Sequence, residues 1–180
     1  MTQLKQNIMT VATRLFLEEG IAVSTAKIAK AAGISNGSLF NAFPTKQALI
    51  DSLYIEAKIA MLASLVHVDD QPLNRQLLYD NWQSYLAWAR AYPYQRQIMH
   101  LLLDAGLASA DAQAEVSKIA APHAVRLQQT LDEGIIKGPS VQFISKLIFF
   151  QLDMVINENL SDEKEQLAFD MLCNAIGLNQ

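Results

Sequence analysis

The sequence has little of what a disulfide-stabilised or membrane-spanning protein needs. It contains one cysteine, Cys173, so an intrachain disulfide is impossible and a reducing, cytoplasmic compartment is expected. Its most apolar stretch, residues 141–156, is broken by polar residues that include Ser145, Lys146, Gln151 and Asp153, and it is too short and too polar to span a bilayer. Polar residues are spread through the first seven positions and Arg14 lies within the apolar part that follows, so no signal peptide is expected.

Charged residues are also scarce, and they are unevenly distributed. They make up 18% of the chain, against 51% apolar residues, whereas about 25% is usual. Such an apolar excess is typical of a subunit interface or an internal cavity. The net charge of −4 argues against nonspecific coating of nucleic acid, yet residues 1–50 carry five cations against two carboxylates, and the remainder carries nine against sixteen. A small cationic head on an acidic body suits a protein that meets phosphate at one end only.

Patterns typical of strands and of catalytic sites are missing as well. No stretch alternates apolar and polar residues beside a hairpin turn, whereas helical spacing runs almost throughout. We therefore predict an all-α fold of about nine helices. The three histidines are scattered, and there is no nucleophile elbow, phosphate-binding glycine loop or set of paired carboxylates. We predict no metal, no cofactor and no enzymatic activity.

Two very short helices near the start of the chain indicate a helix-turn-helix. They are expected at about 25–32 and 36–43, separated by Gly33-Ile34-Ser35, and a DNA-reading helix must enter a groove about 12 Å wide. Thr45 is expected to cap a longer helix running toward Val66, with a buried side formed by Leu49, Leu53, Ile59 and Leu62. We predict a DNA-binding domain over residues 1–48 and a ligand-binding and dimerisation domain over 49–180.

The residue types within this segment favour DNA reading. Ala29 is small where two helices must cross, Gly33 permits the sharp turn, and Ser35 can cap the second helix. Leu39 and Phe43 are expected to face inward, while small or polar residues face outward, and an amide such as Asn36 or Asn41 can pair with adenine. The alternative is a plain helical hairpin in a bundle, but a core hairpin does not need Ser-Asn-Gly-Ser on its exposed start.

The segment AKIAKAAGISNGSLFNAFPTKQAL resembles the TetR/AcrR family of bacterial regulators. The resemblance covers about the first 55 residues and depends on the combination of IA..AGIS, G.LF..F and P.K..L. The fragments GIAVSTAKIAKAAG, LIDSLY and WQSYLAWA, the last followed by a proline, look most like the multidrug-sensing RamR-type repressors. The resemblance implies a helical DNA-binding repressor with a ligand pocket in its body.

The resemblance also implies roles for individual residues. Residues at the positions of Asn36, Gly37, Ser38 and Asn41 usually approach bases or the sugar-phosphate, and those at Ser24, Thr25 and Lys46 usually meet phosphates. Phe40 departs from the pattern, because the family commonly has a tyrosine there whose hydroxyl contacts phosphate. Either that contact is lost or the ring serves only packing. Ala26 and Ala42 are also short, so specificity is expected to depend on few residues and on DNA shape.

The body holds both tryptophans and all five tyrosines. Aromatic residues at helical spacing are usually core, but the family resemblance implies an enclosed pocket, and apolar pockets favour aromatics with a few polar groups. We predict a site for a small apolar or aromatic effector, with Asp153 either a partner for a cationic ligand or a surface or interface charge. The predicted lining is Tyr54, Met61, Trp82, Tyr85, Met99, Ile148, Gln151 and Asp153.

The last two predicted helices, from Gly138 to Leu160 and from Ser161 to Gly177, are apolar on too many faces for a single packing partner. We predict a homodimer through these helices, as a four-helix bundle across a two-fold axis. Such a dimer would hold two reading helices about 34–36 Å apart over a palindromic site in double-stranded DNA. The alternative is a monomer with a thick core.

Together these features predict a repressor that an effector releases from its operator, with activation left open. One alternative is a small-molecule binding protein whose helix-turn-helix is vestigial, which would show no salt-dependent DNA binding. The other is an α-helical enzyme, whose activity would not depend on Asn36 or Lys46.

Overall fold

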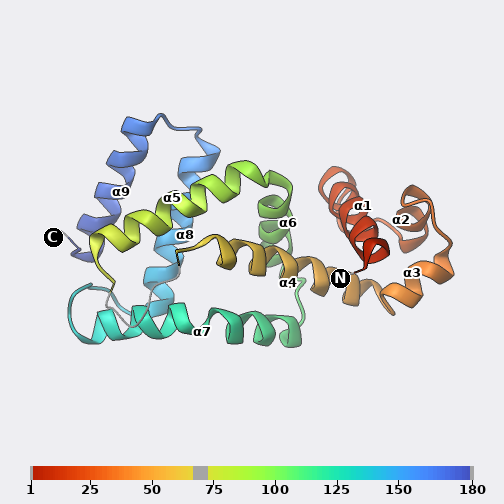
Figure 1. The fold of residues 1–180 in the computed structure, drawn as a ribbon, viewed down its shortest axis with the longest axis horizontal. Helices are drawn as coiled ribbons and strands as arrows, with labels where there is room; N and C mark the ends of the chain where they lie inside the picture. Colours follow the sequence, from red (N-terminus) through yellow and green to blue (C-terminus); the bar gives the residue numbers. More distant parts are fainter. Residues whose placement is uncertain (1, 67–72, 179–180) are drawn as a thin grey trace. The chain divides into compact units, whose positions relative to one another are not determined.

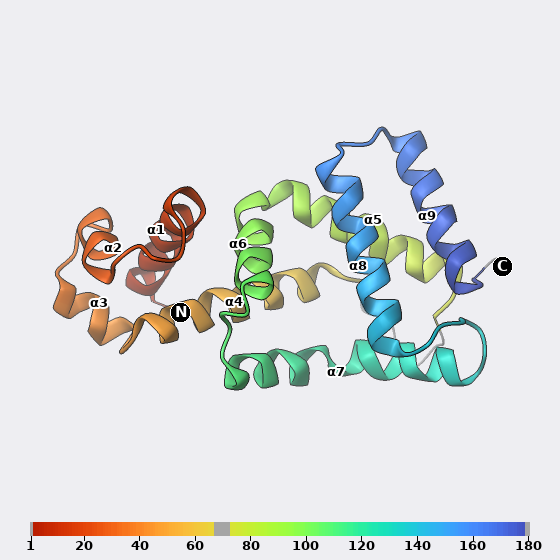
Figure 2. The ribbon, with the colours of Figure 1, turned by 180° about the vertical axis from the view of Figure 1, so that it is seen from behind.

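The computed structural model describes residues 2–66 and 73–178, and in that part of the chain it contains nine helices and no strand. The predicted all-α fold is therefore confirmed. Figures 1 and 2 show the helices from opposite sides. They are α1 (Gln3–Glu19), α2 (Thr25–Ala31), α3 (Asn36–Ala42), α4 (Lys46–Ser64), α5 (Arg75–Ala91), α6 (Pro93–Asp104), α7 (Ala110–Asp132), α8 (Val141–Asn157) and α9 (Asp162–Ile176).

Hydroxyl side chains begin the helices of the predicted DNA-binding head. Ser24 accepts a hydrogen bond from the Lys27 amide at 3.2 Å, and Thr45 accepts one from the Ala48 amide at 2.9 Å. Each satisfies an amide that lacks a partner within its helix. These bonds explain why local sequence predicts the helix starts so closely.

The chain forms two compact units. Unit 1 contains the described residues up to Ala60 together with Tyr92–Lys118, and unit 2 contains Met61–Ala91 and the described residues from Ile119 onward. The functional boundary expected between residues 48 and 49 stays a prediction, because these units are defined by packing.

The core of unit 1 forms where α1 packs against α2, α3 and α6. Its fully buried side chains include Ile8, Phe16, Ile28, Leu39 and Leu49. Their spacing follows the helical period, so each short helix contributes one apolar face and leaves the other to solvent.

The buried face of α4 differs from the predicted one at Ile59, whose side chain is 42% exposed. The face instead repeats every four residues, through Leu49, Leu53, Ala57 and Met61. Ile59 follows Ala57 by two residues, which is about 200° around the helix axis. The prediction for Ile59 was therefore wrong.

In unit 2, α5 packs against α8 and α9, and α8 packs against α9. Trp82 contacts Phe169 edge-on, with ring centroids 5.6 Å apart, and Arg90 pairs with the buried carboxylate of Glu165. α8 begins at Val141, later than predicted, because Ser140 is the N-cap and accepts a hydrogen bond from the Phe143 amide at 3.2 Å. None of the helices in the described part of the chain is long and apolar enough to cross a membrane.

Candidate nucleic-acid interface

The helix α3 is held to the head through one narrow apolar edge. It packs against α2 and α1, and its inward side chains are Leu39, with no exposed surface, and Phe43, which caps its C-terminal end and is buried. Ala29 is also buried, as its small size predicts. Between the two helices Gly33 has a left-handed backbone with φ of 69°, which a glycine adopts without the strain of a side chain. The turn and the apolar edge fix the orientation of α3.

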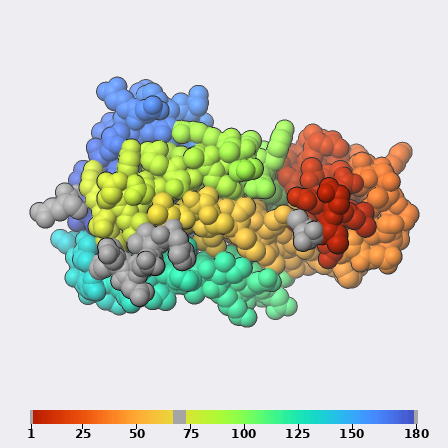
Figure 3. Space-filling view, viewed as in Figure 1, coloured from red at the N-terminus to blue at the C-terminus, as the bar shows by residue number. Residues whose placement is uncertain are grey.

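The opposite face of α3 is open to solvent. Asn36, Gly37 and Asn41 are exposed, and the space-filling view shows the orange α3 segment at the surface (Figure 3). Among the described residues the side-chain amides of Asn36 and Asn41 make no hydrogen bond. Ser38 is half-buried, and its hydroxyl lies 2.9 Å from that of Ser35, the N-cap. Two amides are thus available for groups outside the chain, while Ser38 is partly engaged.

The ring of Phe40 is 42% exposed. It follows the buried Leu39 directly, so it lies about 100° around the helix from the apolar edge. The ring is therefore partly open to solvent, and the two interpretations of Phe40, a lost phosphate contact or a packing role, stay predictions.

The residues expected at phosphates take different positions. Ser24 is exposed and Thr25 is half-buried at the start of α2. Lys46, at the first residue of α4, is half-buried; its ammonium donates a hydrogen bond to the Ile21 carbonyl and lies 5.7 Å from the centroid of the Phe16 ring. Lys46 therefore ties α4 to the loop before α2, and a phosphate would have to share or displace that contact.

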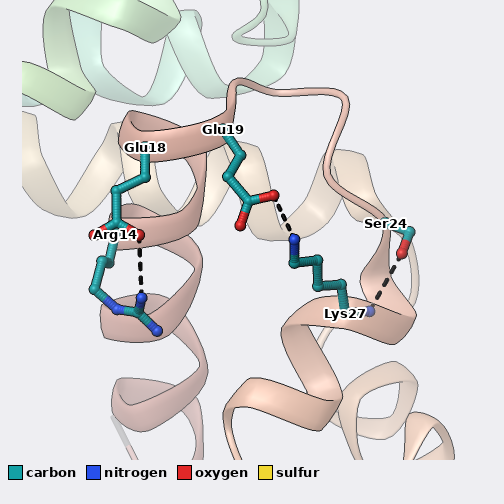
Figure 4. Close-up of polar contacts among 5 residues, drawn as sticks. All are labelled: Arg14, Glu18, Glu19, Ser24 and Lys27. Carbon is teal, nitrogen blue, oxygen red and sulfur yellow. Dashed lines mark hydrogen bonds and ion pairs between the residues drawn. The ribbon is translucent and has the colours of Figure 1, made fainter.

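Two cations of the head are paired with its own carboxylates (Figure 4). Arg14 binds Glu18 at 3.1 Å along one turn of α1, and Lys27 binds Glu19. The Arg14–Glu18 spacing of four residues is visible in the sequence, but only the fold brings Lys27 to Glu19. Exposed pairs of this kind contribute about 1 kcal/mol or less, so a phosphate can compete for either cation.

The predicted ligand pocket draws on residues from both units. Tyr54 and Met99 belong to unit 1, and the other six belong to unit 2. Because the eight predicted residues are divided between the two units, a shared site stays a prediction. Burial of the individual side chains is compatible with it: Tyr54, Met61, Trp82, Tyr85, Met99 and Gln151 are buried, and Ile148 and Asp153 are half-buried. Burial raises the pKa of the Tyr54 hydroxyl.

Within unit 2 the predicted polar residues have protein partners. The Tyr85 hydroxyl donates to the Asp153 carboxylate at 3.1 Å, and the Gln151 amide donates to the Ala168 carbonyl at 2.6 Å. In contrast, the buried indole N–H groups of Trp82 and Trp88 make no hydrogen bond within the described residues. Trp88 is absent from the predicted lining, although its spacing from Trp82 and Tyr85 is helical.

A separate open depression of about 640 Å³ lies between α5 and α9. It shares no residue with the predicted pocket, and Arg75 in its lining forms a 2.6 Å ion pair with Asp170. Sequence reasoning missed it, because it depends on two helices distant in the sequence. Its lining is Asn74, Arg75, Gln76, Tyr79, Gln166 and Phe169.

α8 and α9 lie side by side (Figures 1 and 2), and each keeps large apolar side chains at the surface. Their inner sides are buried, as at Leu152 and Leu172. The exposed fractions are 53% for Phe143, 65% for Phe150, 45% for Met154, 60% for Leu167 and 60% for Met171. These five residues, here called the α8–α9 apolar surface, are not part of the core of this chain.

The remaining groups with potential chemistry are the single thiol and possible metal ligands. Cys173 is fully buried on α9, and burial raises the pKa of its thiol, with the nearby Arg75 acting in the opposite direction. Among the described residues no group of three or more histidine, cysteine, aspartate or glutamate side chains could hold a metal ion.

Comparison with known proteins identifies the head. Residues 8–53 match the sequence model described as "Bacterial regulatory proteins, tetR family". This match spans most of α1, all of α2 and α3, and the first part of α4, which are the elements that position the exposed face of α3.

Solved structures share the fold over nearly the whole chain. A protein from Shewanella sp. PV-4, assigned to the tetR family of transcription regulators, is 22% identical, with a TM-score of 0.80 over 97% of this chain and 98% of its own. A TetR family transcription regulator from Marinobacter aquaeolei VT8 is 21% identical, with a TM-score of 0.78 over 96% and 95% of the two chains. AibR, solved in complex with isovaleryl coenzyme A and operator DNA, is 14% identical, with a TM-score of 0.70 over 97% and 98%.

The head therefore matches the tetR family model over residues 8–53, and the chain has the same fold as solved TetR family transcription regulators. The matched model and the names of these structures describe regulatory proteins, so they do not favour the alternative of an α-helical enzyme.

Proposed function

We propose that this protein is a transcriptional repressor that reads double-stranded DNA with α3. The observation that carries the proposal is the exposed face of Asn36, Gly37 and Asn41 on a short helix anchored by Leu39. Exposed amides on a helix of seven residues suit the major groove, where asparagine bonds adenine through two hydrogen bonds. Ser24, Thr25 and Lys46 are proposed as phosphate contacts beside it.

The repressor acts as a homodimer through the α8–α9 apolar surface. Five large apolar side chains exposed on two adjoining helices form the kind of patch that monomeric proteins rarely leave open to water. A two-fold axis through this surface pairs each helix with its copy and gives a four-helix bundle. The two α3 helices then meet successive turns of a palindromic operator, about 34–36 Å apart.

A small apolar or aromatic effector releases the repressor, as in a RamR-type multidrug sensor. Support comes from the aromatic residues of α5 and from the buried indole N–H groups of Trp82 and Trp88, which an acceptor on a ligand would satisfy. AibR, which has this fold, was solved with both an acyl-coenzyme A and operator DNA. Tyr54 lies on α4, the helix that begins at Lys46, so a ligand beside Tyr54 would reach the reading head through one helix. A coupling free energy of about 1–3 kcal/mol suffices for release.

The test is a DNA-binding titration of the purified protein. Duplexes that bind are selected from random sequence, and the dissociation constant is measured at several salt concentrations. A repressor of this kind selects a palindrome and binds more weakly as salt rises, because cations on the protein displace counterions from phosphate. Asn41→Ala should weaken binding, whereas Gln97→Ala, which removes an exposed amide from α6, should not.

The same titration tests the alternative of a vestigial helix-turn-helix. If no duplex binds in dilute salt, or if binding is insensitive to salt and to Asn41→Ala, the protein does not read DNA with α3. Effector binding without any DNA binding would then support a small-molecule binding protein.

A further inference from the structure

The large apolar ring of Phe40 lies partly in solvent. Its side chain is 42% exposed, whereas the other large apolar side chains of this segment, Leu39 and Phe43, are 0% and 3% exposed. The other exposed residues of α3, Asn36, Gly37 and Asn41, are polar or small. Phe40 is therefore the one large apolar group of α3 that points out of the core.

The position of Phe40 places it at the flank of the reading surface. Asn36 and Phe40 are four residues apart on one helix, so their side chains lie on the same side, one turn from each other. Asn41 is the next residue and lies about 100° further around the axis. The ring thus adjoins both exposed amides, and a helix that brings those amides to base edges brings the ring to a neighbouring base pair.

The chemistry of the ring limits what it can contact there. A phenyl group has no donor for a phosphate oxygen. In the major groove the 5-methyl group of thymine is the apolar feature of the base edges, and phenylalanine is one of the side chains that contact it. Burying the exposed part of the ring against that methyl group removes apolar surface from water on both partners.

We propose that Phe40 is a specificity-determining residue that reads a thymine in each half-site by packing its ring against the 5-methyl group. The inference rests on the proposed function, because it requires α3 to lie in the major groove. It goes beyond that function by naming one base, one group on that base and the side chain that recognises it. It also separates this chain from relatives in which a hydroxyl at this position could bond phosphate.

The test removes the methyl group from the DNA and leaves the protein intact. A selected palindromic duplex is synthesised with deoxyuridine in place of thymidine at one symmetric pair of positions at a time. The dissociation constant is then measured for the wild-type protein, Phe40→Ala, Phe40→Leu and Asn41→Ala. Deoxyuridine pairs with adenine as thymidine does, so each replacement deletes only the methyl groups.

One symmetric pair of replacements should weaken wild-type binding about fourfold per half-site, or about fifteenfold for the dimer, since each buried group of this size contributes about 0.8 kcal/mol. In Phe40→Ala the same replacement should change binding less than twofold, and in Phe40→Leu the loss should be intermediate. In Asn41→Ala, a matched change on the same helix, the loss should persist. Urea unfolding checks that every variant folds.

Two results would overturn the inference while leaving the proposed function standing: a salt-dependent palindromic site with no thymine in its half-sites, or deoxyuridine losses that are the same in Phe40→Ala and wild type. The latter would show that Phe40 does not contact the methyl group. If no duplex is selected at all, the proposed function itself fails. Because the deoxyuridine arm uses the wild-type protein, a Phe40→Ala variant that does not fold leaves the comparison of wild type with Phe40→Leu decisive.

Discussion

Replacing Gly37 with alanine should change stability and DNA affinity in opposite directions. Gly37 lies in the first turn of α3, and its side of the helix is exposed. A Cβ atom built there would meet only the Ser35 hydroxyl oxygen, at 3.7 Å, which is an ordinary contact. The backbone is helical, so alanine fits without strain. Because glycine in a helix costs roughly 0.5–1 kcal/mol relative to alanine, Gly37→Ala should raise the free energy of unfolding by about 0.5 kcal/mol.

On DNA the same methyl group becomes an obstacle. If the exposed face of α3 lies against base edges, the added carbon must displace the helix or the bases. Overpacking of a close interface costs typically 1–3 kcal/mol, which corresponds to a dissociation constant raised about 5-fold to 150-fold. If Gly37 lay away from the DNA, Gly37→Ala would raise the free energy of unfolding and leave the operator affinity unchanged.

The assay combines urea unfolding with a fluorescence-anisotropy titration of a labelled operator. Gly33→Ala is the matched control: its Cβ has no atom within 4 Å, but its φ of 69° makes alanine unfavourable by about 1–2 kcal/mol. The Gly33→Ala variant should have a lower free energy of unfolding. Its operator affinity should fall only if the substitution distorts the head. A Gly37→Ala protein that is more stable and binds its operator as tightly as the wild type would refute the placement of α3 in the groove.

Three further predictions concern charges and the dimer. Glu19→Gln frees the Lys27 ammonium from its partner, so the salt dependence of the DNA dissociation constant should steepen by about 0.9 per added phosphate contact. The control Glu18→Gln frees Arg14 instead. Equal slopes for wild type and Glu19→Gln would contradict the expectation. Arg90→Ala leaves the Glu165 carboxylate, only 4% exposed, without its cation, so it should lower the free energy of unfolding in urea by about 3 kcal/mol. Glu165→Gln should lower it less, because the Arg90 side chain that then loses its partner is half exposed to water. Phe150→Glu places a charge in the α8–α9 apolar surface, so sedimentation should show a monomer that no longer binds the operator; a dimer of unchanged stability would place the interface elsewhere.

Local features of the sequence were enough to predict the head. The caps at Ser24, Ser35 and Thr45 and the left-handed Gly33 depend on neighbours within a few residues. The inward positions of Leu39 and Phe43 follow from the helical period alone. These features determine which side of α3 faces solvent, so the candidate DNA-binding surface could be read from the sequence.

Contacts between distant residues could not be predicted in the same way. Tyr85 and Asp153 are 68 positions apart, and Arg90 and Glu165 are 75 apart. No local pattern pairs them, so Asp153 was left as either a ligand partner or a surface charge, whereas it accepts a hydrogen bond from a buried tyrosine. The exposed Ile59 shows a related limit: apolar residue type alone does not fix burial when a helix already has a complete buried face.

Because the single thiol is buried, its rate of chemical modification measures local opening of the structure. Cys173 has no exposed surface and lies on α9, beside residues of the α8–α9 apolar surface. A water-soluble disulfide reagent can modify it only when that helix separates from its neighbours, because attack requires both access and the thiolate. The rate of modification therefore reads out how often the C-terminal helices open, and since no other thiol is present, it does so without background.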